Sequence, residues 1–192
     1  MNRCAWVDTA NRLYVDYHDN EWGVPVYDDK ILFEFLILEG AQAGLSWITV
    51  LQKRQGYHKA FSGFDVQKVA SFSETNIQKL RNDTSIIRNE LKIRAAVTNA
   101  RAFIKIQEEF GSFNAFLWSY VDGAPIVNHW NNIREVPVTT SESDRISKEL
   151  KKRGFKFVGS TIMYAYMQAV GLVNDHTTDC FKHPAHNRNE LI

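Results

Sequence analysis

The four prolines of the chain all fall between segments with helical periodicity, and this spacing constrains the fold most. They stand at positions 25, 125, 137 and 184, so long stretches contain no residue that breaks a helix. Apolar residues in these stretches recur every three or four positions, often behind a Ser, Thr, Asp or Asn that can cap a helix. Strand signals are weak, at 136–138 and 155–158. The sequence therefore predicts an all-α fold.

The predicted helices begin at capping residues and several end at a glycine, which favours a helix C-terminus. Gly44, for example, interrupts the pattern between two helices, and Gly111 ends the longest one. The helices are expected at 28–43, from Ser46 onward, at 64–69, 73–80, 91–110, 113–121, 141–150 and 160–171.

The composition is that of an ordinary globular protein. The 192 residues are 44% hydrophobic and 23% charged, and we expect one domain spanning 1–192. The formal net charge is only +1, which argues against attachment to nucleic acid by bulk charge but allows a locally basic face.

The first residues lack the apolar run of a signal peptide, and no apolar stretch approaches the ~20 residues of a membrane span. The two cysteines do not form a disulfide framework. We therefore expect a cytoplasmic protein with reduced thiols and no membrane partner.

Glu39 interrupts the apolar stripe of the predicted helix 28–43. It follows Leu32, Phe35 and Leu36 on the same face. An ionised carboxylate in an apolar site is costly unless it is paired. Either the side chain reaches solvent or an arginine, or it faces a pocket where it can bind a cation or a hydrogen-bond donor.

Gly44 permits a sharp turn after this helix and places Leu45 at the tip of a tight loop. Leu45 either packs into the core or is an apolar wedge that enters between DNA bases. Five aromatic residues precede the helix: Trp6, Tyr14, Tyr17, Trp22 and Tyr27. Such residues usually belong to the core. If several of them line one cavity, they can instead stack on a flat base.

Cysteine and histidine occur together near both ends of the sequence. Cys4 and His18 lie early, and His176 and Cys180 lie late with an H-x3-C spacing. Four such ligands would make a closed, structural zinc site, whereas a catalytic zinc keeps one position open. His183 or His186 could replace one ligand, and a Cys4–Cys180 disulfide is a poorer option in a reducing compartment.

Two segments are candidates for binding phosphate. Six cations and one glutamate lie between 145 and 156, and a helix then begins at Gly159, Ser160 and Thr161. The polar turn at 86–92 would expose Arg88 and Lys92 between two helices. Both segments fit an ordinary solvated surface as well.

Taken together, these residues resemble the 3-methyladenine DNA glycosylase I family of helix-hairpin-helix glycosylases. The resemblance covers residues 3 to about 180 and rests on long ordered runs. They are RCAWV at 3–7, YHDNEWGVP at 17–25, LEG at 38–40, QAGLSWITVL at 42–51, KKRGFKFVG at 151–159 and GLVNDH at 171–176.

The resemblance implies two helical lobes with a base pocket between them, and one structural zinc held by Cys4, His18, His176 and Cys180. It implies base-excision repair: hydrolysis of the N-glycosidic bond of 3-methyladenine in alkylated double-stranded DNA after base flipping, with the free base as product. Glu39 would be the catalytic residue, as general base or recognition group, and Tyr17, Trp47, Tyr14 and Trp6 would bind the base. Gly44 and Leu45 would form the wedge, and Arg88, Lys92, Gly159, Ser160 and Thr161 would contact DNA.

The segment after Lys92 places neither the aspartate nor the lysine nucleophile of the wider superfamily convincingly. We therefore expect a monofunctional enzyme that uses water, acts as a monomer and has no lyase step. Two other classes remain. A non-enzymatic damage reader would lack the pocket carboxylate, and a zinc hydrolase would need an open three-ligand site.

Overall fold

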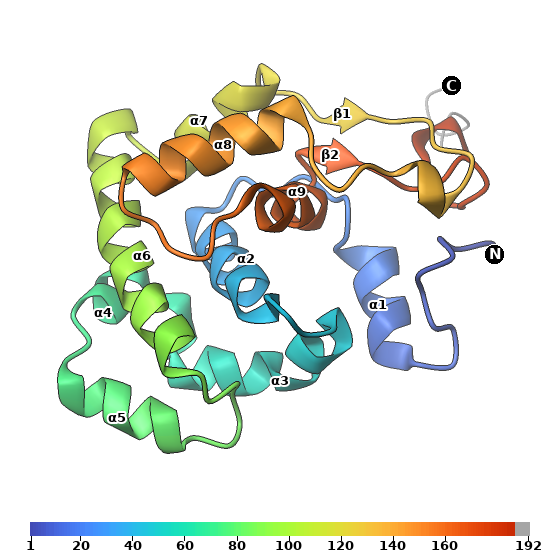
Figure 1. Cartoon of the computed structure of the whole chain (residues 1–192). Coiled ribbons are helices and arrows are strands. Elements are labelled where there is room, and N and C mark those ends of the chain that lie inside the picture. Colours follow the sequence, from blue (N-terminus) through green and yellow to red (C-terminus); the bar gives the residue numbers. More distant parts are fainter. Residues whose placement is uncertain (187–192) are drawn as a thin grey trace.

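The computed structural model describes residues 1–186, and within them the chain is mainly helical (Figure 1). This confirms the predicted fold class at the coarse level. The α-helices are α1 (Arg12–Asn20), α2 (Asp29–Gln42), α3 (Trp47–Ala60), α4 (Val66–Ala70), α5 (Glu74–Asn82), α6 (Glu90–Phe110), α7 (Phe113–Trp118), α8 (Ser141–Lys152) and α9 (Ser160–Ala169). Short 3-10 turns occur at Ser62–Phe64, Ser119–Val121, Ile133–Glu135 and Pro184–His186.

The described residues contain one small sheet, and it is not where the weak strand signals lie. Strand β1 (Ile126–Val127) pairs in parallel with β2 (Val173–Asn174). The segments 136–138 and 155–158 are irregular. The first of them contains a proline, and the second includes Phe157, whose φ of 54° lies outside the strand region.

Side-chain caps explain where the helices begin. The Asp28 carboxylate accepts from the Ile31 backbone N–H at the start of α2, and Asn89 accepts from Lys92 N–H at the start of α6. Ser73 and Thr140 form reciprocal capping boxes at α5 and α8. Gly111 ends α6 in the left-handed conformation, with a φ of 82°.

Helices α2 and α9 lie in the middle of the molecule, with α6, α3, α8 and α1 around them (Figure 1). Nine of the fourteen residues of α2 are buried, on almost every face of the helix. The buried apolar side chains form one continuous cluster that includes residues of every α-helix. The stretch 35–41 of α2 is buried without interruption, and Glu39 lies within it, so the Glu39 side chain has little access to solvent.

The N-terminal segment lies beside the last described segment (Figure 1). Phe181 N–H donates to the Asn2 carbonyl at 2.9 Å, and Asn2 Nδ2 donates to Asp179 Oδ2 at 2.6 Å. These bonds join residues that are far apart in sequence and close the side of the molecule that contains α1. Within residues 1–186, no helix is both long and apolar enough to cross a membrane.

Candidate functional site

A cavity of about 540 Å³ opens between α1, α2, α3, α9 and the irregular segment 133–138. Its volume is in the range of small-molecule sites. The cavity brings together all five predicted pocket residues. It is lined by Trp6, Tyr14, Tyr17, Trp22, Glu39, Gln42, Ser46, Trp47, Ile133, Val136, Pro137, Val138, Thr161, Tyr164, Ala165 and Gln168.

Glu39 lies on the inner side of this cavity and is only 3% exposed. Its Oε2 atom has no hydrogen-bond partner among the described residues. Burial raises the pKa of Glu39 from its ordinary value of 4.5 to about 8. The first alternative, a carboxylate that reaches solvent or an arginine, is therefore wrong, and the side chain offers an acceptor to whatever enters the cavity.

Aromatic rings form the walls. Tyr17 and Trp47 have ring centroids 5.4 Å apart with planes inclined by 51°, so the two rings converge without stacking on each other. Trp6 contacts Tyr14 and Trp22 edge-on at 5.7 and 5.1 Å. The indole N–H groups of Trp6 and Trp47 are buried and have no acceptor among residues 1–186.

The cavity thus combines unpaired donors, one unpaired carboxylate oxygen and several ring faces. Buried polar groups are normally hydrogen-bonded, so three such groups on one cavity indicate a site that a ligand completes. A flat, electron-poor or cationic ring with N–H groups at its edge matches this set, because aromatic faces attract cations and the carboxylate accepts hydrogen bonds.

Tyr164 and Gln168 on α9 line the cavity and were not predicted. Both are held by Asp175, a buried carboxylate that accepts from Tyr164 OH at 2.6 Å and from Gln168 Nε2 at 2.8 Å. Asp175 also accepts from Asn128 and Trp130. A sequence signal was present, since Thr161, Tyr164 and Gln168 follow an i, i+3, i+7 pattern on an otherwise apolar helix.

Tyr27, the last residue of the aromatic run, does not belong to the cavity. Its ring is 53% exposed and stacks on Trp118 with centroids 4.6 Å apart. The chain between Trp22 and α2 turns away from α1, so Tyr27 lies over α7 instead.

The loop 43–46 between α2 and α3, which we call the wedge loop, lies beside the cavity. Gly44 adopts a φ of 78°, a Cβ atom added to it would meet nothing within 4 Å, and Leu45 is 41% exposed. Leu45 is therefore not packed in the core, which contradicts the first of the two interpretations that the sequence allowed for this residue. The loop joins the helix that carries Glu39 to the helix that begins with Trp47.

The predicted phosphate-binding residues lie on exposed or partly exposed segments with one exception. Arg88 is exposed in the loop 83–89 between α5 and α6, and Gly159, Ser160 and Thr161 form the start of α9. Lys92 was expected to be exposed, which is wrong. Its ammonium group turns inward and donates to the carbonyls of Ala41 and Ala43, because the first turn of α6 packs against the end of α2.

The predicted metal ligands gather next to the cavity wall, since the ring centroid of His18 lies 5.4 Å from that of Trp6 and the ring centroid of His176 lies 4.7 Å from that of Trp22. Ligand atoms of Cys4, His18 and Cys180 all lie within 4.8 Å of one another, and all three side chains are buried. Cys180 Sγ is 3.4 Å from His18 Nε2. His183 and His186, the alternative ligands, bind backbone carbonyls elsewhere, at Asn128 and Thr178.

His176 lies against this cluster, with its ring centroid 5.0 Å from that of His18. Its Nε2 atom is buried and has no partner within residues 1–186, while Nδ1 lies 2.9 Å from Asn174 Oδ1. His18 Nδ1 likewise lies 2.7 Å from Asp19 Oδ1. Each ring can therefore donate from Nδ1 and leave Nε2 free as a metal ligand. Burial lowers the pKa of His176 to about 4, so the ring is neutral.

The chain matches the family described as methyladenine glycosylase over residues 6–183. It is 52% identical over 184 residues to DNA-3-methyladenine glycosylase 1 of Escherichia coli K12, a match that covers 96% of this chain and 98% of that protein. A crystal structure of a 3-methyladenine DNA glycosylase I superposes with a TM-score of 0.93 at 51% identity, covering 95% of this chain and 100% of that chain. A variant of such an enzyme in complex with 3-methyladenine gives 0.92 at 38% identity, with coverage of 96% and 98%.

Proposed function

The chain belongs to the methyladenine glycosylase family, and from that membership we propose that it removes 3-methyladenine from alkylated double-stranded DNA. The reaction is hydrolysis of the N-glycosidic bond, the first step of base-excision repair, with the free base as product. The observation that carries the proposal is the unpartnered carboxylate of Glu39 inside an aromatic cavity of the described chain.

The chemistry of the damaged base fits this cavity. Methylation at N3 gives adenine a delocalised positive charge, which weakens the bond to the sugar and makes the base a good leaving group. Glu39 accepts from the exocyclic amine and favours the cationic ring, and Tyr17 hydrogen-bonds the ring edge. Trp47 stacks on the ring face, which adds a cation–π contribution of about 0.5–2 kcal/mol. Neutral adenine lacks most of these interactions, so recognition of charge supplies the selectivity.

Water is the nucleophile in this proposal. No lysine within residues 1–186 lines the cavity, so no amine lies where it could attack the sugar and cleave the strand. The enzyme is therefore monofunctional. This leaves a sugar without its base in an intact strand.

The lesion reaches the cavity only after it leaves the double helix, at a cost of a few kcal/mol. Leu45 fills the space that the base leaves, as apolar side chains do in other proteins that open DNA. The helix–loop–helix of α5 and α6 serves as the hairpin that grips the backbone, with Arg88 at its loop. The start of α9, at Gly159, Ser160 and Thr161, presents free N–H groups to a second phosphate.

One structural zinc ion bound by Cys4, His18, His176 and Cys180 completes the proposal. Two observations support it: the ligand atoms of Cys4, His18 and Cys180 lie together, and the ring of His176, whose Nε2 atom is orphaned, lies against that of His18. The ion would stabilise the fold and take no part in the reaction. Metal analysis of the purified chain is expected to give one zinc per chain, and loss of zinc on Cys180→Ser. A preparation that folds without metal would contradict the assignment.

Base release from alkylated duplex DNA tests the activity. We expect the wild-type protein to release 3-methyladenine, with little 7-methylguanine or adenine, when the freed bases are separated by chromatography. Glu39→Gln is expected to slow release by about tenfold or more while leaving the affinity for undamaged DNA nearly unchanged.

The matched control is Glu108→Gln, which changes an exposed carboxylate on α6 and is expected to behave like the wild type. A folded, metal-loaded protein that binds alkylated DNA and releases no base would instead be a damage reader. Equal loss of selectivity and of affinity for undamaged DNA in Glu39→Gln would contradict the recognition role.

A further inference from the structure

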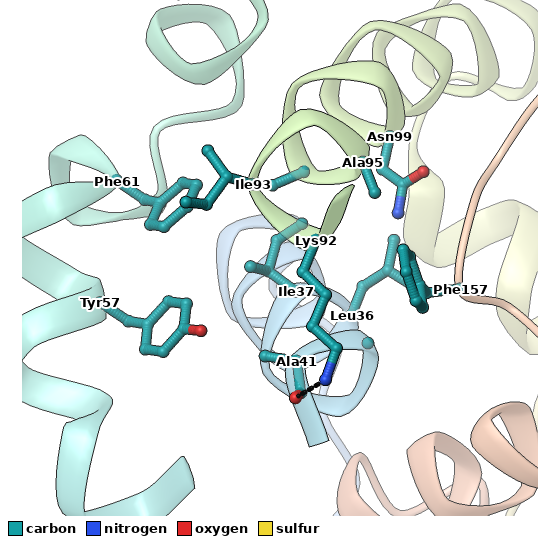
Figure 2. Close-up of a pocket in the computed structure, with 12 residues that line it drawn as sticks. Leu36, Ile37, Ala41, Tyr57, Phe61, Lys92, Ile93, Ala95, Asn99 and Phe157 are labelled. Atoms are coloured by element: carbon teal, nitrogen blue, oxygen red, sulfur yellow. Dashed lines mark hydrogen bonds between the residues drawn. The ribbon is translucent and has the colours of Figure 1, made fainter. Parts of the chain in front are cut away.

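Lys92 lies in the first turn of α6 and extends across a narrow crevice of about 20 Å³ to the end of α2 (Figure 2). Its Nζ atom donates to the Ala41 carbonyl at 2.8 Å and to the Ala43 carbonyl at 2.6 Å. The dashed line in Figure 2 marks the first of these bonds, and the side chains of Leu36, Ile37 and Phe157 flank the crevice. Two of the three N–H donors of the ammonium group therefore bind carbonyls at the C-terminal end of α2.

The position has a simple electrostatic cause. The last carbonyls of a helix lack intrahelical donors and carry partial negative charge, so a cation at that end is favourable. No carboxylate within residues 1–186 forms an ion pair with Lys92, and desolvation lowers its pKa. The ammonium group thus donates to two backbone carbonyls, and it pairs with no carboxylate of the described chain.

These carbonyls lie next to the wedge loop. Ala43 is the first residue of that loop, and its bond to Lys92 is the only hydrogen bond of the described chain that joins the loop to anything beyond its two flanking helices. The other bonds of the loop are local, from Leu45 N–H to the Gln42 carbonyl, from Thr49 N–H to the Ser46 carbonyl, and between the Ser46 and Thr49 hydroxyls.

Lys92 also belongs to the hairpin. It lies in the first turn of α6, which follows the loop 83–89, and its own backbone N–H donates to the side chain of Asn89, the cap of α6. One residue therefore connects the element expected to hold the DNA backbone with the loop expected to enter the base stack.

We propose that Lys92 is a positioning residue, which fixes the wedge loop against the α5–α6 hairpin so that gripping the backbone places Leu45 at the damaged pair. The proposal rests on the proposed function. It replaces the direct phosphate contact expected from the sequence, because the ammonium donors point to α2.

The test compares Lys92→Met, which keeps the length and apolar stem of the side chain, with Lys105→Met. Lys105 is the matched control, since it is an exposed lysine on the same helix α6 and its side chain forms no hydrogen bond or ion pair within residues 1–186. Lys92→Gln is a second variant in case the methionine variant does not fold. Four quantities are measured: single-turnover release of 3-methyladenine from duplex DNA, binding of free 3-methyladenine by tryptophan fluorescence, the salt dependence of affinity for undamaged duplex, and the melting temperature.

A positioning role predicts release from duplex slowed by about tenfold or more, because small misplacements cost this much. Free-base binding is expected to stay within about twofold of the wild type, as is every measured property of Lys105→Met. The salt slope should not change. If the slope of log affinity against log salt concentration becomes smaller in Lys92→Met by about the amount of one phosphate contact, Lys92 binds a phosphate directly and the proposal is overturned. Free-base binding weakened in step with the melting temperature would show a merely structural role and also overturn it.

A double-mutant cycle with Leu45→Ala tests whether Lys92 acts through the wedge. If it does, Lys92→Met slows the Leu45→Ala enzyme far less than it slows the wild type. Independent, additive effects would contradict the proposal. A wild-type protein that releases no 3-methyladenine would instead refute the proposed function, so the two failures are distinguishable.

Discussion

Glu39 and Lys92 show opposite limits of what a sequence reveals about single residues. Glu39 was predictable because a carboxylate within an apolar helical stripe must face either solvent or a pocket, and α2 is buried on nearly all sides. The inward turn of Lys92 was not predictable, since its partners are carbonyls on a helix about fifty positions earlier in the chain. Every residue has a backbone carbonyl, so the sequence does not indicate which carbonyl a polar side chain will bind.

The raised pKa of Glu39 makes stability depend on pH. Folding favours the neutral carboxyl, whose pKa rises from 4.5 to about 8. This contribution is fully present below pH 4.5 and is lost as the pH rises through 8. Glu39→Gln has no such group. The melting temperature of Glu39→Gln minus that of the wild type should therefore increase as the pH rises from about 5 to about 8. Each pKa unit corresponds to about 1.4 kcal/mol in the free energy of unfolding.

Thermal unfolding of both proteins across this pH range, without ligand, checks the prediction. A melting-temperature difference that stays constant with pH would show that Glu39 ionises without cost in the empty cavity.

At the scale of elements, helices with apolar stripes were predicted, and α1 was missed. The inward face of α1 consists of Tyr14, Tyr17 and His18, while Leu13 is 40% exposed. The inner face of this nine-residue helix carries tyrosine and histidine, which are weaker signals of a buried helical face than the aliphatic residues of the other helices. Strands β1 and β2 have two residues each, which is too short for any alternation to appear.

Close packing of α3 against the loop 83–89 depends on Gly56. A Cβ atom at this position would lie less than 3 Å from the carbonyl group of Ser85, so the loop would have to move. We expect Gly56→Ala to destabilise the fold by about 1–3 kcal/mol. Because the loop carries Arg88, affinity for duplex DNA should fall as well. Urea unfolding and DNA titration measure the two effects.

Gly40→Ala is the matched control, since Gly40 is also inside a helix. Its added Cβ would meet Phe157 at 3.5 Å, an ordinary contact. The better helix propensity of alanine predicts a neutral or slightly stabilising effect. If both variants are equally destabilised, the close approach at Ser85 is not the cause.

At the scale of the whole molecule, the sequence predicted that residues from both ends of the described chain meet, and the structure brings Cys4, His18 and Cys180 together. These residues could be selected from the sequence as candidate metal ligands because cysteines and histidines are rare residues whose chemistry is specific. The remaining cavity wall at 133–138 could not be predicted, because apolar loop residues carry no comparable signal. The interpretation of the chain as one domain with two lobes stays a prediction.

Removal of the proposed zinc should therefore affect both ends and the cavity. His18 is adjacent to Tyr17 on α1, so loosening the cluster loosens one wall of the site. We expect chelation to lower the melting temperature by about 10 °C or more and to weaken binding of free 3-methyladenine. Calorimetry and fluorescence titration before and after dialysis against a chelator measure both, and restored zinc should reverse them. An unchanged melting temperature in a fully stripped protein would rule out a structural ion.

The contact between His18 and Cys180 spans 162 positions of the chain, which has a consequence for synthesis. A ribosome adds about 5–20 residues per second, so roughly ten to thirty seconds pass between the synthesis of His18 and that of Cys180. Throughout that time α1 lacks its contact with the segment that carries Cys180, and only residues nearer in sequence can hold it, such as Phe35 and Trp47, whose rings lie beside that of Tyr17. The cavity wall closes only after α9 has been made, so a product terminated before α9 would present its aromatic residues to chaperones and proteases instead of to DNA.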